Sequence, residues 1–151
     1  MDWYNILITV ESYLKGYPVF LSDDGILRDA AGVHASYRPG NATSPAVEAI
    51  LKGITDLKLK SLYLYLDSPI SFSGKMASDL RERIISLLTI PFEVAALPSA
   101  DFSLKSFTGI VASSDSAIMD KENLPEIFDL SRYVLERSFR FQAITLAQLR
   151  L

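Results

Sequence analysis

The chain has 151 residues, of which 49% are hydrophobic and 22% charged, and its formal net charge is −3. This composition excludes a disordered chain and predicts a single globular domain over residues 1–151. The negative charge excludes a protein that holds nucleic acid by charge alone. No apolar run approaches the ~20 residues of a membrane span, so we expect a cytoplasmic protein with no membrane partner.

The cysteine and histidine content restricts the chemistry further. There is no cysteine and one histidine, His34. Thiolate zinc sites, iron–sulfur clusters and multi-histidine metal sites are therefore excluded. A metal site in this chain would be built mostly from oxygen ligands, which indicates Mg²⁺, Mn²⁺ or Ca²⁺. Because His34 lies in a turn-rich loop, we assign it no catalytic role.

The first part of the chain contains one ambiguous segment and two clear ones. Residues 5–14 begin with a β-branched run that favours a strand, but they end in residues that could continue a helix. Residues 18–29 predict a hairpin, because an Asp-Gly pair separates two apolar runs. Residues 32–45 are rich in turn formers and predict a loop, and a helix capped by Ser44 follows.

The rest of the chain alternates strands with helices. Apolar runs predict strands at 61–67, 92–97 and 109–113, and a last short strand at 126–130. A second amphipathic helix follows residues 68–74, and 131–151 is helical in composition, with Ser131 as its cap. This order predicts an α/β sandwich around a mostly parallel sheet.

Acidic residues follow two of the predicted strands. Asp67 closes the strand at 61–67, Asp115 follows the strand at 109–113, and Asp120 could return to the same edge after one helical turn. Ligands collect at the carboxyl ends of parallel strands, so these acids predict a shared site. The alternative is that each aspartate only caps the helix that follows it.

A serine-rich turn offers a second feature. The stretch LDSPISFSGK (66–75) feeds a helix N-terminus, where Ser71 and Ser73 could bind phosphate through hydroxyl and backbone N–H groups. The alternative is an ordinary capped helix.

Four pieces of the sequence carry a family resemblance: DWYNILITVES, FLSDDGILRD, LDSPISFSG and SSDSAIMD. Together they resemble an uncharacterised family of archaeal and bacterial proteins known as a domain of unknown function. The opening Asp-Trp-Tyr-Asn is also similar to the Asp-Gly-Tyr-Asn signature of NYN nucleases in the PIN-like superfamily. That likeness implies a Rossmann-like three-layer sandwich with acidic residues around one or two divalent cations.

The resemblance also implies site residues. Asp2 matches the first acid of the nuclease signature, Asn5 its asparagine and Asp115 a later acid, while Asp67 and Asp120 correspond more loosely. Trp3 replaces the usual glycine, and the strand that should deliver Asp2 is missing. Either the chain is a fragment of a longer parent, or the ILITV run serves as the first strand.

Three functions follow from these observations. The first is a phosphodiester hydrolase acting on RNA, with Asp2, Asp67 and Asp115 as catalytic residues and, with Asp120, as ligands of Mg²⁺ or Mn²⁺. The second is an inactive binding or oligomerisation module that associates through 131–151, where apolar residues exceed what one helix need bury. These are Val134, Leu135, Phe139, Phe141, Ile144, Leu146 and Leu149. The third is a nucleotide binder or small-molecule phosphohydrolase that uses the serine-rich turn.

Overall fold

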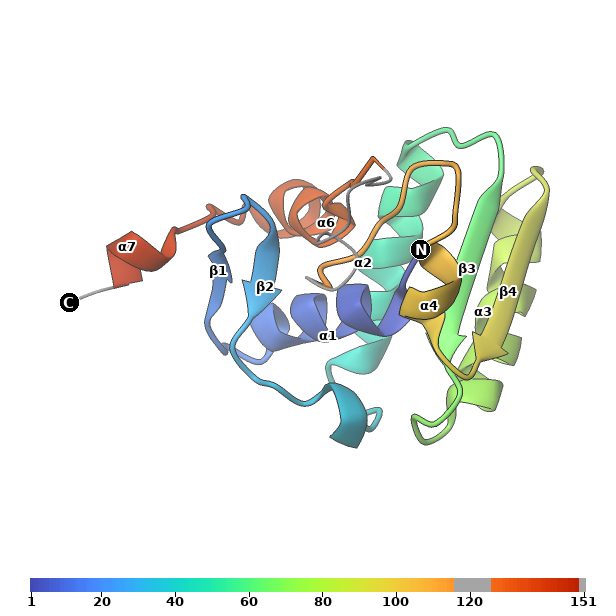
Figure 1. Cartoon of the computed structure of the whole chain (residues 1–151), viewed down its shortest axis with the longest axis horizontal. Helices are drawn as coiled ribbons and strands as arrows, with labels where there is room; N and C mark the ends of the chain where they lie inside the picture. The colour runs from blue at the N-terminus through green and yellow to red at the C-terminus, as the bar shows by residue number, and fades with distance from the viewer. Residues whose placement is uncertain (116–125, 150–151) are drawn as a thin grey trace.

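The computed structural model describes residues 1–115 and 126–149. The chain opens with helix α1 (Trp3–Leu14), which crosses the centre of the molecule (Figure 1). Nine of its residues are buried, on every side of the helix. It contacts the helices α2 (Thr43–Asp56) and α6 (Leu130–Phe139) and the strands β2 (Leu27–Asp29) and β3 (Leu62–Asp67). A helix that is apolar all round is a buried core helix. The ambiguous segment at 5–14 is therefore helical.

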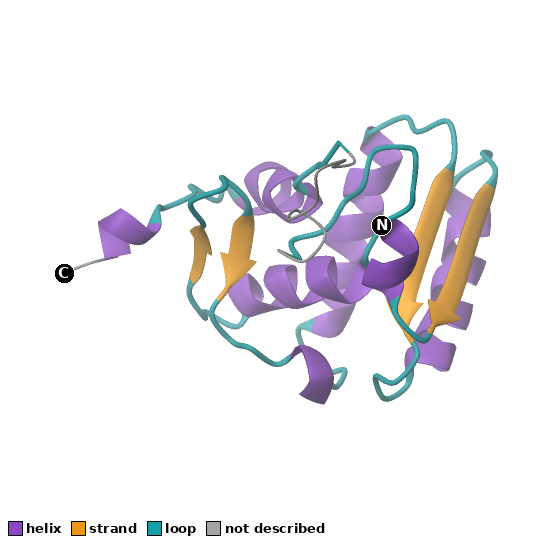
Figure 2. Ribbon diagram, in the orientation of Figure 1, coloured by secondary structure: helices purple, strands orange, loops and turns teal. Residues whose placement is uncertain are grey.

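Two short sheets lie on either side of α1 (Figure 2). Strands β1 (Val19–Leu21) and β2 (Leu27–Asp29) form an antiparallel hairpin, so the prediction from the Asp-Gly pair is confirmed. Strands β3 (Leu62–Asp67) and β4 (Phe92–Leu97) pair in parallel, with Asp67 opposite Leu97 at their carboxyl ends.

The expected Rossmann-like three-layer sandwich of the PIN-like type is wrong. The described residues form two separate two-stranded sheets and no extended parallel central sheet. The predicted strands at 109–113 and 126–130 make one isolated bridge, between Val111 and Ile127. The segment that was to supply a further strand is the buried helix α1. Apolar content alone could not distinguish these states, because a buried helix and a buried strand are both apolar throughout.

The remaining helices cover these sheets. Helix α3 packs on β3 and β4, while α1, α2 and α6 pack on one another and share most of the core. Asp129 caps α6 in place of the predicted Ser131: its Oδ1 accepts a hydrogen bond of 3.0 Å from the backbone N–H of Arg132. The helices are η1 (His34–Ser36), α2 (Thr43–Asp56), α3 (Ser73–Leu87), α4 (Ala100–Leu104), α6 (Leu130–Phe139) and α7 (Leu146–Leu149).

The C-terminal segment is partly buried and partly extended. Val134 and Leu135 on α6 are buried in the core, whereas Ile144 is 38% and Leu146 39% exposed. Helix α7 stands apart from the rest of the described chain (Figure 1). The segment just before it is held to β1 by a hydrogen bond of 2.8 Å from the Leu21 N–H to the Ile144 carbonyl. No described helix combines the length and apolar character that a bilayer crossing requires.

Candidate functional site

The parallel pair β3–β4 positions the first acid of the site. Asp67 is the last residue of β3, and its carboxylate accepts a hydrogen bond of 2.8 Å from the backbone N–H of Ala100, at the start of α4. Its other oxygen lies 3.0 Å from Nε2 of His34 in η1. Asp67 therefore joins two segments that approach the end of the sheet from different directions.

Backbone pairing brings Asp2 to the same place. The Tyr65 N–H donates to the Met1 carbonyl at 2.9 Å, and the Asp2 N–H donates to the Ala112 carbonyl at 2.9 Å. Residues 1–2 thus lie between β3 and the segment at 111–112. Asp2 is also the N-terminal cap position of α1, although its side chain caps no backbone N–H group. Its carboxylate is left available for other contacts.

The Asp2 carboxylate is buried and only half satisfied. The residue is 1% exposed. Its Oδ2 accepts hydrogen bonds from the Asn5 amide at 2.5 Å and from the Ser113 hydroxyl at 3.1 Å. Its Oδ1 has no hydrogen-bond partner among the described residues. A buried charge without a partner is costly, so this oxygen calls for a proton or a cation.

Burial accordingly raises the pKa of Asp2. The pKa rises from 3.8 to about 6, first because burial disfavours the charged form and further because the Asp67 carboxylate lies nearby. The hydrogen bonds from Asn5 and Ser113 act in the opposite direction without cancelling the rise. The group therefore ionises close to neutral pH, where a bound cation would favour its charged form.

Four carboxylates surround one cavity of about 330 Å³, which we call the acidic pocket. It is lined by Asp2, Asn5, His34, Asp67, Asp101 and Asp115. The Ser113 hydroxyl connects two of these residues, since it donates to Asp2 and accepts from the Asp115 N–H at 3.1 Å. Asp101 accepts a hydrogen bond from the Ser99 hydroxyl, which lowers its pKa. The pocket therefore concentrates negative charge.

The acids predicted at 2, 67 and 115 thus meet in one pocket, together with Asn5. Asp120 lies outside the described residues. Ser71 and Ser73 do not line the acidic pocket. Ser71 is exposed, and the buried Ser73 hydroxyl donates to the Ser68 carbonyl at 3.0 Å at the start of α3, whose N-cap residue Phe72 makes no side-chain capping hydrogen bond.

Sequence reasoning missed His34 and Asp101. No local signal distinguishes His34, because its loop reaches the pocket only through tertiary contacts. Asp101 could have been found: it follows β4 by four residues, and β4 ends at the same sheet edge as Asp67. The rule that selected Asp67 applies equally to this neighbouring strand.

The donor set suits a hard cation bound through few protein ligands. Among residues 1–115 and 126–149, no group of three or more histidine or acidic side chains is arranged to hold one metal ion. Mg²⁺ commonly uses only one or two carboxylates and keeps several water molecules. Asp2, with its free Oδ1, and the neighbouring Asp67 fit that mode, and they do not fit a closed structural site.

Comparison with known proteins finds relatives but no function. The sequence model of a domain of unknown function, DUF5616, matches residues 1–133. An uncharacterized protein of Methanocaldococcus jannaschii, MJ0935, is 32% identical over 136 residues, which cover 90% of this chain and 64% of that protein. The chain thus spans less than two thirds of this relative's length. No solved structure matches the chain. The resemblance to NYN nucleases gains no support from these matches.

Proposed function

The chain belongs to the DUF5616 family, whose model covers its first 133 residues, and from the acidic pocket we propose that it is a divalent-metal-dependent phosphodiester hydrolase. The observation that carries this proposal is the half-satisfied carboxylate of Asp2. Its Oδ1 is buried without a partner among the described residues, and Asp2 lines a polar cavity together with a second carboxylate, that of Asp67. A Mg²⁺ or Mn²⁺ ion would complete this oxygen's coordination.

Each residue of the pocket has a role in the proposal. Asp2 and Asp67 supply carboxylate oxygens to the cation. Asn5 and Ser113 hold the Asp2 carboxylate in place through hydrogen bonds to Oδ2, and this leaves Oδ1 free. His34 donates to Asp67 and fixes its orientation, as a residue behind a metal ligand commonly does. When bound, a divalent cation polarises a phosphoryl oxygen and lowers the pKa of a water molecule.

The charge of the pocket sets one requirement for this reaction class. A pocket with four carboxylates repels an anionic phosphodiester unless cations offset them. A metal ion would supply that offset where charge develops in the transition state. Asp101, which pairs with Lys105 at 3.5 Å, and Asp115 complete the acidic lining of the pocket. RNA, as an abundant phosphodiester, is the substrate that we expect.

Calorimetric titration with Mn²⁺, combined with hydrolysis of bis(p-nitrophenyl) phosphate, tests the proposal. The full chain should bind Mn²⁺ and hydrolyse the diester, and Asp67→Asn should weaken both at least tenfold. Asp56→Asn is the control, because Asp56 pairs with Lys52 at 3.1 Å outside the pocket. Failure of the wild-type chain to bind Mn²⁺ at millimolar concentration would remove the proposal.

The second candidate is an inactive binding or oligomerisation module. It is favoured by the exposed Ile144 and Leu146 on the extended C-terminal segment and by the structural hydrogen bonds already made to both oxygens of Asp67. Sedimentation velocity would distinguish the candidates. A dimer that Leu146→Ser dissociates, in a chain without Mn²⁺ affinity, would favour the module.

A further inference from the structure

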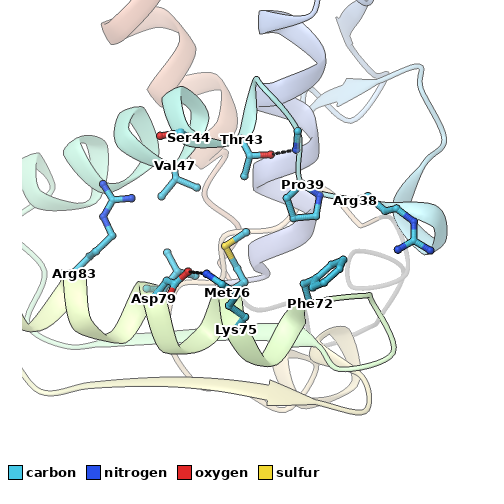
Figure 3. A pocket seen from close by; sticks show the side chains of 12 residues that line it. Arg38, Pro39, Thr43, Ser44, Val47, Phe72, Lys75, Met76, Asp79 and Arg83 are labelled. Atoms are coloured by element: carbon cyan, nitrogen blue, oxygen red, sulfur yellow. Dashed lines mark hydrogen bonds and ion pairs between the residues drawn. The ribbon is translucent and has the colours of Figure 1, made fainter.

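A second cavity, larger than the acidic pocket, lies between the N-terminal halves of α2 and α3 (Figure 3). Its volume is about 630 Å³. We call it the basic groove, after the three cations among the residues that line it. The residues that carry the argument are Arg38, Val47, Phe72, Lys75, Met76 and Arg83. None of the predicted site residues contributes to it.

The charge of the groove is opposite to that of the whole chain. Its lining carries three cations and one carboxylate, Asp79, whereas the chain as a whole has a formal charge of −3. Arg38 is exposed and makes no ion pair with any described residue. Lys75 pairs with Asp79, and Arg83 pairs with Glu48. Both ion pairs lie at the surface, where such a pair is worth little and can yield to a phosphate.

An aromatic ring stands at one end of the groove. Phe72 is 60% exposed, and its backbone is left-handed, with φ 65°. A bulky residue rarely adopts this conformation, so the turn holds the ring outward at a cost. Figure 3 shows Phe72 facing Pro39, with Met76 beside it and Arg83 reaching toward α2 at the other end. Apolar surface from Val47 and Met76 lies between.

The groove is also close to the acidic pocket in the chain. Two stretches of the chain contribute to both: residues 34–38 supply His34 to the pocket and Arg38 to the groove, and residues 67–72 supply Asp67 to the pocket and Phe72 to the groove. Arg38 follows His34 by four positions, so their Cα atoms lie at most about 14 Å apart. Arg83 follows Phe72, the N-cap residue of α3, by eleven positions along the helix, or about 16 Å. The two cavities are therefore lined by adjoining stretches of the chain.

From these features we propose that the basic groove binds a single-stranded nucleic acid and leads it to the acidic pocket. The proposal rests on the hydrolase function and names its substrate class. A base stacks on Phe72 and the apolar surface beside it, while Arg38, Lys75 and Arg83 contact successive phosphates. Stacking platforms combined with a cationic groove are how proteins hold single strands without reading their sequence.

Fluorescence anisotropy of the full chain with labelled oligouridylate and oligothymidylate, in EDTA, tests the groove without hydrolysis. Phe72→Ala should raise the Kd about tenfold or more. Lys75→Ala should raise it severalfold and reduce the salt dependence of log K by about 0.7. The RNA and DNA probes show which sugar the groove prefers.

Two control variants match these changes. Lys52→Ala removes an exposed lysine that, like Lys75, pairs with an aspartate four residues later. Tyr17→Ala removes an aromatic residue that is 54% exposed and lies just after the C-terminal end of α1, outside the groove. Both should leave the Kd unchanged. Equal losses in the control and groove variants, or a Kd for AMP as low as that for the oligonucleotides, would overturn the proposal.

Hydrolysis of bis(p-nitrophenyl) phosphate by the wild-type chain separates the two proposals. Oligonucleotide binding that depends on Phe72 and Lys75, without diester hydrolysis, would support the groove and overturn the hydrolase. Hydrolysis without oligonucleotide binding would overturn the groove alone.

Discussion

Nε2 of His34 lies 3.0 Å from Oδ2 of Asp67, across a separation of 33 residues in the chain. The His34 side chain is 42% exposed and that of Asp67 only 18%. The histidine therefore closes the solvent side of the carboxylate, while the Ala100 N–H holds its other oxygen. Both contacts fix the direction in which Asp67 presents its lone pairs to the acidic pocket.

We predict that His34→Ala weakens Mn²⁺ binding and diester hydrolysis by about 10- to 100-fold, the usual effect of removing a residue that orients a metal ligand. His34→Gln should retain most of both, because its amide can still donate to Asp67. Calorimetry and hydrolysis rates measure the two effects. If His34→Ala binds Mn²⁺ as tightly as the wild type, the contact has no part in metal binding.

The effect of Asp2→Asn on the stability of the chain should depend on pH. Because the pKa of Asp2 rises from 3.8 to about 6 on folding, the stabilisation from its protonated form is present below pH 3.8 and is lost as the pH rises through 6. The ionised group therefore costs about 3 kcal/mol above pH 7. Asn keeps the side-chain shape without the charge.

Asp2→Asn should thus raise the free energy of unfolding by up to about 3 kcal/mol at pH 8 and leave it unchanged at pH 3.5. Urea denaturation at both pH values measures this. Saturating Mn²⁺ should stabilise the wild type at pH 8 and not the variant. A difference between variant and wild type that is the same at both pH values would show that Asp2 ionises without cost in the folded chain.

The sequence predicted those parts of the fold that have local signals. The hairpin at 18–29 follows from its Asp-Gly turn, and β3 and β4 follow from short apolar runs with helices after them. The segment at 5–14 had no such signal, since a helix buried on every side shows no amphipathic period. Of the run at 109–113, only residues 111–113 are buried, Ile110 is exposed, and the run makes a single bridge, so its apolar character did not predict a strand of a sheet.

The residues of the candidate site also divide into those with a local signal in the sequence and those without one. Asp67 and Asp115 were predicted because each follows an apolar run, while Asp2 was predicted only from a family resemblance. His34 was missed because its place in the pocket depends on the hydrogen bond to Asp67 and on the path of the loop after β2. Contacts between distant segments of this kind leave no pattern in the nearby sequence.

Asp129 should contribute strongly to the stability of the fold, because its carboxylate accepts hydrogen bonds from two elements. One oxygen caps α6, and the other accepts a hydrogen bond of 2.7 Å from the N–H of Leu27, a fully buried residue in β2. Asp129→Ala should lower the free energy of unfolding by about 3 kcal/mol, from the lost cap and the unsatisfied N–H.

Asp129→Ser separates these contributions, since serine can cap the helix but is too short to reach β2. Its loss should lie between that of Asp129→Ala and zero. Equal losses for serine and alanine in urea denaturation would assign the whole effect to the contact with Leu27.

Gly53 is the point of closest contact between α2 and α6. A Cβ atom at Gly53 would lie 2.8 Å from Cγ2 of Val134, which is fully buried. Alanine is the better helix former by about 1 kcal/mol. Val134 has little rotamer freedom in its helix and cannot turn its methyl group away from the added Cβ atom. The helices α2 and α6 must therefore separate, at a typical cost of about 1–3 kcal/mol. Gly53→Ala should therefore destabilise the chain, against its helix propensity.

A double-mutant cycle with Val134→Ala isolates this contact. Val134→Ala alone leaves a cavity and lowers stability, but it removes the methyl group that Gly53→Ala would meet. The cost of Gly53→Ala should then disappear or change sign in the Val134→Ala background, as thermal unfolding of the four chains would show. If Gly53→Ala stabilises the wild-type chain, α6 moves away from α2 more easily than its buried packing implies.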